Sequence, residues 1–176
     1  SLDDLVFGGW DIFEEDCYRA ACTAGVIEPS LLQNVRSDLE QIKPWPAVFD
    51  QRYVKRLDGP NVKKGKNKRD LAEQVMEDIR GFKQQHNLDR LVMVWCGSTE
   101  VFMTESEAHA SIENFERALE ENDPSIPSSM VYAYAAIREG IPYANAAPNL
   151  TADIPALVEL AARTKSPLAG KDLKTG

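Results

Sequence analysis

The sequence is poor in the residues from which metal sites and nucleophilic active sites are usually built. Its 176 residues include two histidines and three cysteines. Cys17, Cys22 and Cys96 are odd in number and stand at no metal-ligand spacing. His86 and His109 are isolated, and the helical pattern places His109 on the polar side of a helix. We therefore expect no metal site, no Ser-His-Asp or Cys-His arrangement, and reduced thiols in a reducing, cytoplasmic compartment.

Long apolar stretches and an excess of positive charge are also missing. No apolar run approaches the ~20 residues that span a bilayer, and no signal peptide opens the chain. The net charge of −8 argues against a nucleic-acid or anionic-membrane partner. One basic run, residues 63–69, is most simply a solvated loop, with a phosphate contact as the alternative. The apolar fraction of 43% is typical of one globular domain spanning residues 1–176.

The chain starts with Ser1 rather than Met and finishes inside a glycine-flanked loop, residues 170–176. It also contains no G-x-G-x-x-G, the usual dinucleotide fingerprint. The way the chain starts and finishes leads us to expect a piece of a longer protein.

The most informative stretch is an apolar run, residues 91–95, followed at once by small and polar residues, 96–100. The β-branched and aromatic side chains of the run predict a parallel strand covered on both faces. Ligands of open α/β sheets bind beyond the carboxyl ends of such strands, so residues 96–100 are a candidate site. An ordinary turn with a Ser or Thr cap is the alternative.

Periodicity and breakers predict an alternation of strands and helices, which is typical of parallel pairing through right-handed crossovers. The segment 130–137 is apolar on every side and predicts a buried helix. Strand ends at 8–9, 97–98 and 170 carry glycine or small polar residues, so we expect a ligand crevice at one sheet edge. The predicted strands are 5–7, 91–95, 141–147 and 166–169, and the predicted helices are 14–23, 28–42, 71–85, 107–120, 130–137 and one capped by Asp153.

Two strand-end groups have both a functional and a structural interpretation. Asp11 follows a Gly pair and could bond a ribose, or it could be a helix N-cap. Lys171, Asp172 and Lys174 could hold a phosphate or an oxyanion, with the Asp holding a Lys in place. A solvated polar turn is the alternative for this second group.

Four segments, in order, resemble the myo-inositol-1-phosphate synthase family. The Asp123–Met130 segment also looks like the family's Ser-Pro-Ser segment, and residues 96–102 and 145–150 depart from the eukaryotic pattern toward the prokaryotic branch. The four segments are Val6-Phe-Gly-Gly-Trp-Asp-Ile12, Val94-Trp-Cys-Gly-Ser-Thr-Glu100, Pro142-Tyr-Ala-Asn-Ala-Ala-Pro-Asn149 and Gly170-Lys-Asp-Leu-Lys-Thr-Gly176.

This resemblance implies an α/β, Rossmann-like doubly wound parallel sheet that binds NAD. It also implies that the first strand and the Gly-rich loop precede Ser1, and that a tetramer-forming catalytic domain follows Gly176. The activity implied is isomerisation of D-glucose 6-phosphate to 1D-myo-inositol 3-phosphate, within inositol and phospholipid biosynthesis. The implied reaction proceeds by oxidation of the open-chain sugar, enolisation, intramolecular aldol cyclisation and reduction of the ring ketone. It is therefore redox-neutral overall.

The resemblance also implies the roles of single residues. Asp11 would bond the adenosine ribose, and Val48 would pack near the adenine. Lys174 would face the substrate and stabilise negative charge, with Asp172 beside the nicotinamide. The remaining implied cofactor-binding residues are Cys96, Gly97, Ser98, Thr99, Ala147 and Gly170.

Two other functions stay open at this point. The same fold serves NAD(P)-dependent dehydrogenases, and the piece could be a non-catalytic assembly module. We also expect residues 1–176 alone to lack synthase activity.

Overall fold

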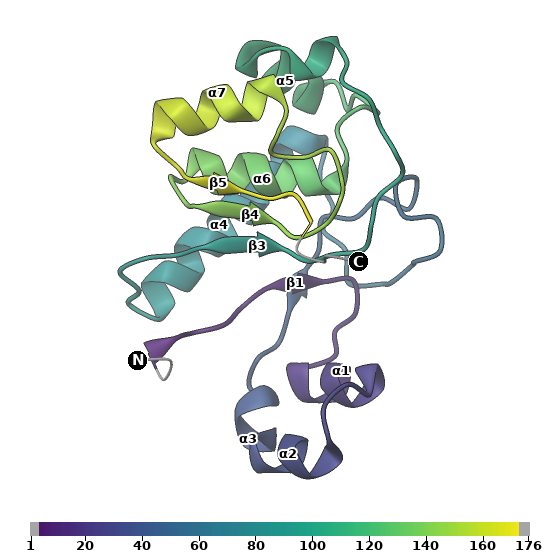
Figure 1. The fold of residues 1–176 in the computed structure, drawn as a ribbon, viewed down its shortest axis with the longest axis vertical. Helices are drawn as coiled ribbons and strands as arrows, with labels where there is room; N and C mark the ends of the chain where they lie inside the picture. The colour runs from purple at the N-terminus through teal and green to yellow at the C-terminus, as the bar shows by residue number, and fades with distance from the viewer. Residues whose placement is uncertain (1–3, 173–176) are drawn as a thin grey trace. The chain divides into compact units, whose positions relative to one another are not determined.

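The computed structural model describes residues 4–172, which divide into two compact units. The first contains the chain up to Phe49 together with Asp58–Lys63, and the second contains Asp50–Leu57 and the chain from Lys64 onward. The domain predicted over residues 1–176 thus contains two units, and each is described by itself (Figure 1).

The first unit holds a short parallel pair of strands, β1 (Trp10–Asp11) and β2 (Trp45–Pro46). The Trp10 and Trp45 rings lie 5.4 Å apart, and the ladder is extended by a bridge between Ala47 and Val62. The strand predicted over residues 5–7 is wrong, since the paired residues follow the Gly8-Gly9 turn rather than precede it.

Three short helices complete the first unit. Helix α1 (Cys17–Ala24) is capped by the Asp16 carboxylate and ends at Gly25, whose φ of 63° is the left-handed conformation that glycine tolerates. The single helix predicted over 28–42 is instead α2 (Pro29–Asn34) and α3 (Arg36–Leu39). The backbone leaves the helical region at Val35, with φ −111° and ψ 12°.

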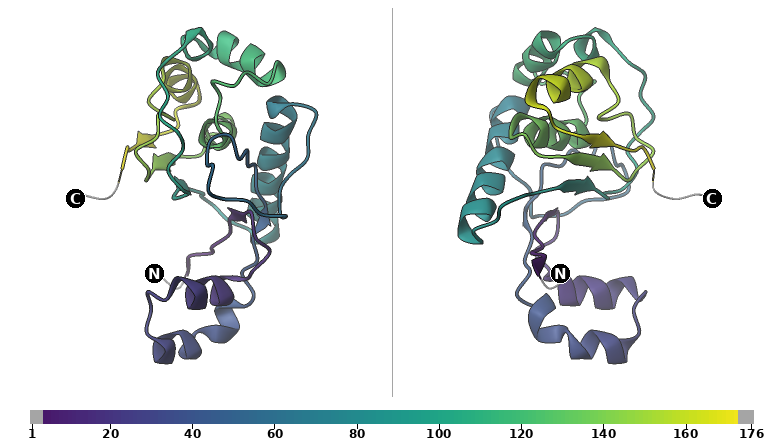
Figure 2. Two further views of the ribbon diagram at one scale, coloured as in Figure 1. Left: turned by 90° about the vertical axis from the view of Figure 1, so that its right-hand side faces the viewer. Right: turned by 60° about the vertical axis from the view of Figure 1, so that its left-hand side comes forward.

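The second unit is built on a parallel sheet of order β3-β4-β5. Its strands are β3 (Met93–Trp95), β4 (Tyr143–Asn145) and β5 (Leu168–Ala169). The right-hand view of Figure 2 shows them side by side. The predicted parallel pairing is confirmed for these three strands, and each is shorter than the apolar run that predicted it.

Helix α6 (Ser128–Arg138) packs on β3 and β4 and buries every residue except Arg138, as its all-round apolar sequence predicts. It also contacts α4 (Lys68–Gln85) and α7 (Pro155–Thr164). Helix α5 (Ile112–Glu120) packs against α7 and follows a turn of 3-10 helix, η2 (Glu107–His109). The crossover helices therefore form a layer on the sheet.

The β3 strand is less buried than its composition predicts. Trp95 faces α6, with its ring 5.5 Å from that of Tyr132. Because side chains alternate along a strand, Val94 points to the other face, where it is 49% exposed. The prediction that both faces are covered is wrong at Val94, which is about half exposed.

Two polar residues occupy positions that local patterns misassigned. His109 is fully buried rather than on a polar helix side. Its Nδ1 accepts the Ser106 N–H at 3.1 Å, and its Nε2 lies 2.9 Å from the Ser125 carbonyl oxygen. Asp153 does not cap α7, whose N-cap is Ile154 and has no side-chain hydrogen bond.

Candidate functional site

The carboxyl ends of β3, β4 and β5 meet at one edge of the sheet, as the sequence predicts for the ends at 97–98 and 170; the predicted end at 8–9 belongs to the first unit. Trp95 pairs with Asn145, and the Ala146 N–H donates to the Trp95 carbonyl oxygen at 2.9 Å. The Asp172 N–H donates to the Ala147 carbonyl oxygen at 3.2 Å. These contacts place three strand-end loops together (Figure 1): residues 96–99 after β3, 146–149 after β4 and 170–172 after β5.

The loop after β3 offers backbone donors to solvent. Residues 96–99 are all exposed, and no acceptor for the N–H groups of Gly97 or Ser98 is found among residues 4–172. A Cβ atom at Gly97 would lie 2.9 Å from the Trp95 ring, so the backbone passes directly over that ring. The Trp95 Nε1 is buried and has no hydrogen-bond partner among the described residues.

The loop after β4 is held by two buried asparagines. The Asn145 Oδ1 accepts the Ala147 N–H at 3.0 Å, and its Nδ2 donates to the Asn149 carbonyl oxygen at 3.0 Å. Gly170 approaches the same backbone: a Cβ there would lie 2.5 Å from the Asn145 carbonyl oxygen. With a φ of 119°, position 170 suits glycine on both grounds.

Glu100 belongs to the candidate stretch 96–100, but its burial was not predicted from the sequence. Glu100, 6% exposed, accepts hydrogen bonds from Ser129 and Asn149. Burial raises the pKa of the Glu100 carboxyl. The hydrogen bonds lower this pKa, but their effect is smaller than that of burial. A signal was available, because Glu100 is an acidic residue placed directly after a strand end among small residues.

Asp11 and Val48 belong to the first unit. The Asp11 Oδ1 accepts the Phe13 N–H at 2.9 Å, and the Asp11 carbonyl oxygen accepts from Asn61 Nδ2 at 2.9 Å. The N-cap alternative for Asp11 is wrong, since Asp16 caps α1. The Asp11 side chain is exposed, whereas Val48 is 6% exposed.

The loop after β5 contains two of the predicted charged residues. Lys171 Nζ lies 2.9 Å from Asp153 Oδ2, so Lys171 is held by Asp153 rather than by the adjacent Asp172. The pKa of Asp153 is lowered, although burial opposes the effect, by hydrogen bonds that include the one from Lys171. Lys174 lies outside the described residues.

Lys64 and Lys66 of the basic run are exposed, as predicted, whereas Lys68 differs from the predicted solvated state. Lys68 is 7% exposed, and its Nζ donates to the Tyr53 hydroxyl at 2.9 Å and to the Asp123 and Ile126 carbonyl oxygens at 2.6 Å each. Burial lowers the pKa of Lys68 to about 8. Its partners lie far away in sequence, so the local pattern could not identify them.

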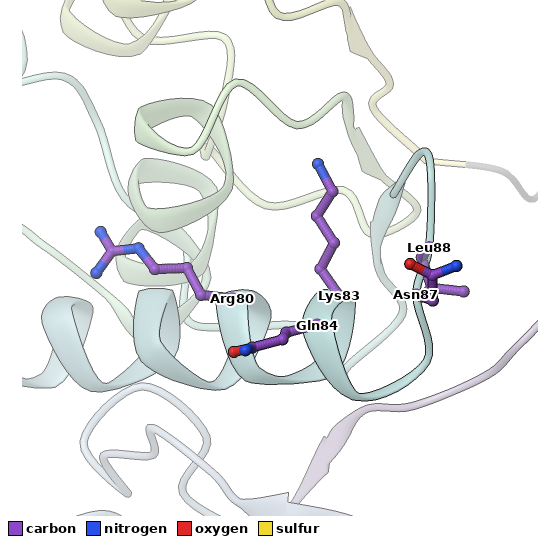
Figure 3. Close-up of a pocket in the computed structure, with 5 residues that line it drawn as sticks. All are labelled: Arg80, Lys83, Gln84, Asn87 and Leu88. Atoms are coloured by element: carbon purple, nitrogen blue, oxygen red, sulfur yellow. The ribbon is translucent and has the colours of Figure 1, made fainter.

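A shallow, open pocket lies at the end of α4 (Figure 3). None of the predicted cofactor-binding residues lines it. Its lining residues are Arg80, Lys83, Gln84, Asn87 and Leu88.

Residues 1–175 match the family model described as myo-inositol-1-phosphate synthase. The chain belongs to the myo-inositol-1-phosphate synthase family. The matched model is that of the family's NAD-binding domain, so the predicted resemblance and the NAD cofactor are confirmed.

Named members of the myo-inositol-1-phosphate synthase family are similar over nearly the whole chain. Inositol-3-phosphate synthase 1 of Bacteroides thetaiotaomicron is 44% identical over 99% of the chain, and the synthase of Mesembryanthemum crystallinum is 35% identical over 99%. The crystal structure of the Caenorhabditis elegans enzyme superposes with a TM-score of 0.93 at 33% identity over the full chain. The Rossmann-like α/β fold is thereby confirmed. The chain spans 41%, 34% and 35% of these three proteins.

The strand-end loops fit the cofactor of the myo-inositol-1-phosphate synthase family. Backbone N–H groups at Gly97 and Ser98 are donors suited to a pyrophosphate or a carboxamide oxygen. At positions 97 and 170, a Cβ atom would meet the Trp95 ring and the Asn145 carbonyl oxygen, so glycine lets these loops pack closely. Among residues 4–172, no group of three or more His, Cys, Asp or Glu side chains could hold a metal ion, and no helix is long and apolar enough to span a bilayer.

Proposed function

We propose that this chain is the NAD-binding part of an isomerase that converts D-glucose 6-phosphate to 1D-myo-inositol 3-phosphate. The observation that carries the proposal is the meeting of three strand-end loops at one sheet edge, in a chain that matches the family's NAD-binding domain throughout. Relatives named inositol-3-phosphate synthase support the same activity.

NAD supplies reversible hydride removal, so a sugar carbon is oxidised and the ring ketone is later reduced, with no net redox change. The task of the chain's own residues is to bind the cofactor, orient it and stabilise charge on the sugar. We assign these roles to the residues at the strand ends.

Asp11 and Val48 are assigned to the adenosine half of the cofactor. The exposed Asp11 carboxylate is an acceptor suited to vicinal ribose hydroxyls, and its Oδ1 is already oriented by the Phe13 N–H. Val48, which is 6% exposed, would pack near the adenine.

The pyrophosphate and nicotinamide half is assigned to the loops of the second unit. Cys96, Gly97, Ser98 and Thr99 present backbone donors, which bind phosphate oxygens without adding side-chain bulk. The neighbouring loops contribute Ala147, Gly170 and Asp172, which the Asp172–Ala147 backbone hydrogen bond holds together.

Lys174 is assigned to the substrate. An ammonium group beside the sugar stabilises the negative charge that develops during oxidation and enolisation. Because the reaction proceeds through such an anion, removing this one charge is expected to lower turnover more than binding.

The finer attributes of the enzyme are part of the proposal. We assign it a cytoplasmic location, supported by three free cysteines, and a homotetramer formed through a second domain. Its product would supply inositol for phospholipids. Sedimentation of the full-length protein tests the tetramer, and a dimer or monomer contradicts it.

The test is to incubate the full-length protein with glucose 6-phosphate and NAD+, following inositol phosphate and NADH together. The proposal expects inositol phosphate without net NADH, and a fall in kcat of about a hundredfold or more in Lys174→Ala. Lys66→Ala, which removes an exposed lysine, is the matched control. Stoichiometric NADH without inositol phosphate would instead identify a dehydrogenase.

A further inference from the structure

The Glu100 carboxylate receives three hydrogen bonds from two distant segments of the second unit. Oε1 accepts the Ser129 N–H at 2.9 Å, and Oε2 accepts the Ser129 hydroxyl at 2.5 Å. Oε2 also accepts from Asn149 Nδ2 at 3.2 Å. Since the Ser129 hydroxyl proton goes to the carboxylate, the Thr151 hydroxyl, 2.9 Å away, must donate to Ser129 Oγ.

Glu100 and Asn149 form a reciprocal pair. The Glu100 N–H donates to Asn149 Oδ1 at 3.0 Å, while Asn149 Nδ2 donates back to the Glu100 side chain. Glu100 directly follows the loop after β3, and Asn149 ends the loop after β4. The pair therefore fixes the spacing of these two loops from beneath.

Glu100 also anchors both loops to helix α6. The N-cap residue of α6 is Pro127, which offers no side-chain hydrogen bond, so the first N–H groups of the helix need another acceptor. Glu100 supplies it at Ser129, and its negative charge complements the helix dipole there. A carboxylate suits this place because every group facing it is a donor.

We propose that Glu100 is a positioning residue of the NAD site, which holds the loops after β3 and β4 at the spacing that the cofactor requires. This inference rests on the proposed function of those loops. Glu100 itself is 6% exposed and lies beneath the exposed loop 96–99, so it acts through the backbone donors rather than by touching the cofactor.

The test compares three variants of the full-length protein. Glu100→Gln keeps the shape of the side chain but removes one acceptor oxygen, and Asn149→Ala removes the link between the loops while leaving the Glu100–Ser129 contact. Glu105→Gln makes the same charge change on an exposed side chain and is the matched control. NAD+ affinity is measured by calorimetry at a temperature where circular dichroism shows each variant folded, together with KM for NAD+, kcat, and hydrogen exchange of the Gly97–Thr99 amides.

We expect NAD+ affinity to fall by about tenfold or more in Glu100→Gln and Asn149→Ala, because small displacements of binding groups are costly. KM for NAD+ should rise while kcat at saturating NAD+ is largely kept, and the protection that bound NAD+ gives the amides of residues 97–99 against exchange should fall. A merely structural role would lower the melting temperature and leave these values unchanged.

Wild-type protein that does not bind NAD+ contradicts the proposed function itself. If wild-type protein binds NAD+ and folded Glu100→Gln shows the same NAD+ affinity and the same amide exchange, only the positioning role is overturned. If Glu100→Gln does not fold, Asn149→Ala decides, and unchanged NAD+ affinity in that variant overturns the inference.

Discussion

Helices α1–α3 of the first unit and helix α6 of the second bury very different shares of their side chains. Among α1–α3 only Leu32 is buried, whereas α6 buries every residue but Arg138. The first unit depends on backbone contacts such as the β1–β2 pair and the Asn61 hydrogen bonds. The second unit depends on side-chain packing and buried polar groups. Substitutions should therefore cost far more in the second unit.

The largest difference is expected from a matched pair of leucines. Leu157→Ala removes a fully buried α7 side chain and should destabilise the protein by about 3 kcal/mol. Leu31→Ala acts on a side chain that is 57% exposed and should cost less than about 0.5 kcal/mol. Urea unfolding of both variants measures the two values, and similar costs would contradict the contrast.

A buried charge is expected to have the next largest effect. Lys68→Met removes three hydrogen bonds, including the one to the Ile126 carbonyl oxygen, and should cost about 2 kcal/mol, against almost nothing for the exposed Lys66→Met. Equal stabilities of the two variants would show that the Lys68 hydrogen bonds contribute little.

Lys68 also predicts a pH dependence. Its folded pKa of about 8 lies below the unfolded value of 10.5, so the unfolded chain binds more protons between these values. Stability from this group is therefore gained as the pH rises from 8 toward 10, below the range where Tyr53 ionises, since burial raises the pKa of Tyr53 to about 12. Unfolding of wild type and Lys68→Met across this window should diverge. Parallel curves would contradict the shift.

Glycine-to-alanine substitutions test the same contrast between the two units. Gly170→Ala places a Cβ 2.5 Å from the Asn145 carbonyl oxygen at a φ of 119°, and should cost about 1–2 kcal/mol and weaken NAD+ binding. Gly9→Ala, in the first unit, has nothing within 4 Å of the new Cβ and should be nearly neutral. Thermal unfolding with and without NAD+ separates the two effects, and a neutral Gly170→Ala contradicts the close packing of the loops.

The smallest effect is expected at an exposed ion pair. Arg36 Nε lies 2.7 Å from Glu40 Oε1 with both side chains partly in solvent, so Arg36→Ala should change the free energy of unfolding very little. Any loss that comes from the ion pair should vanish in 1 M salt. A clear loss that persists in 1 M salt would show that α3 is held more tightly than its burial indicates.

Local sequence patterns predicted the features that depend on local chemistry. The all-round apolar segment 130–137 is the buried α6. The convergence of strand ends also followed from parallel pairing alone. Motifs identified the family, because several short segments had to match in order.

Partners distant in sequence explain the errors. Lys68 is buried because residues 53, 123 and 126 surround it, and Glu100 because residues 129 and 149 do. Neither group of partners can be recognised from the periodicity of a helix or a strand. Val94 shows the converse, since an apolar strand residue is 49% exposed.

A crystal structure of the full-length protein with NAD+ tests the central claim most directly. The account predicts the pyrophosphate or nicotinamide within hydrogen-bond distance of the Gly97 and Ser98 N–H groups, with Gly170 against the ring. NAD+ bound elsewhere, such as in the pocket at the end of α4, would contradict it.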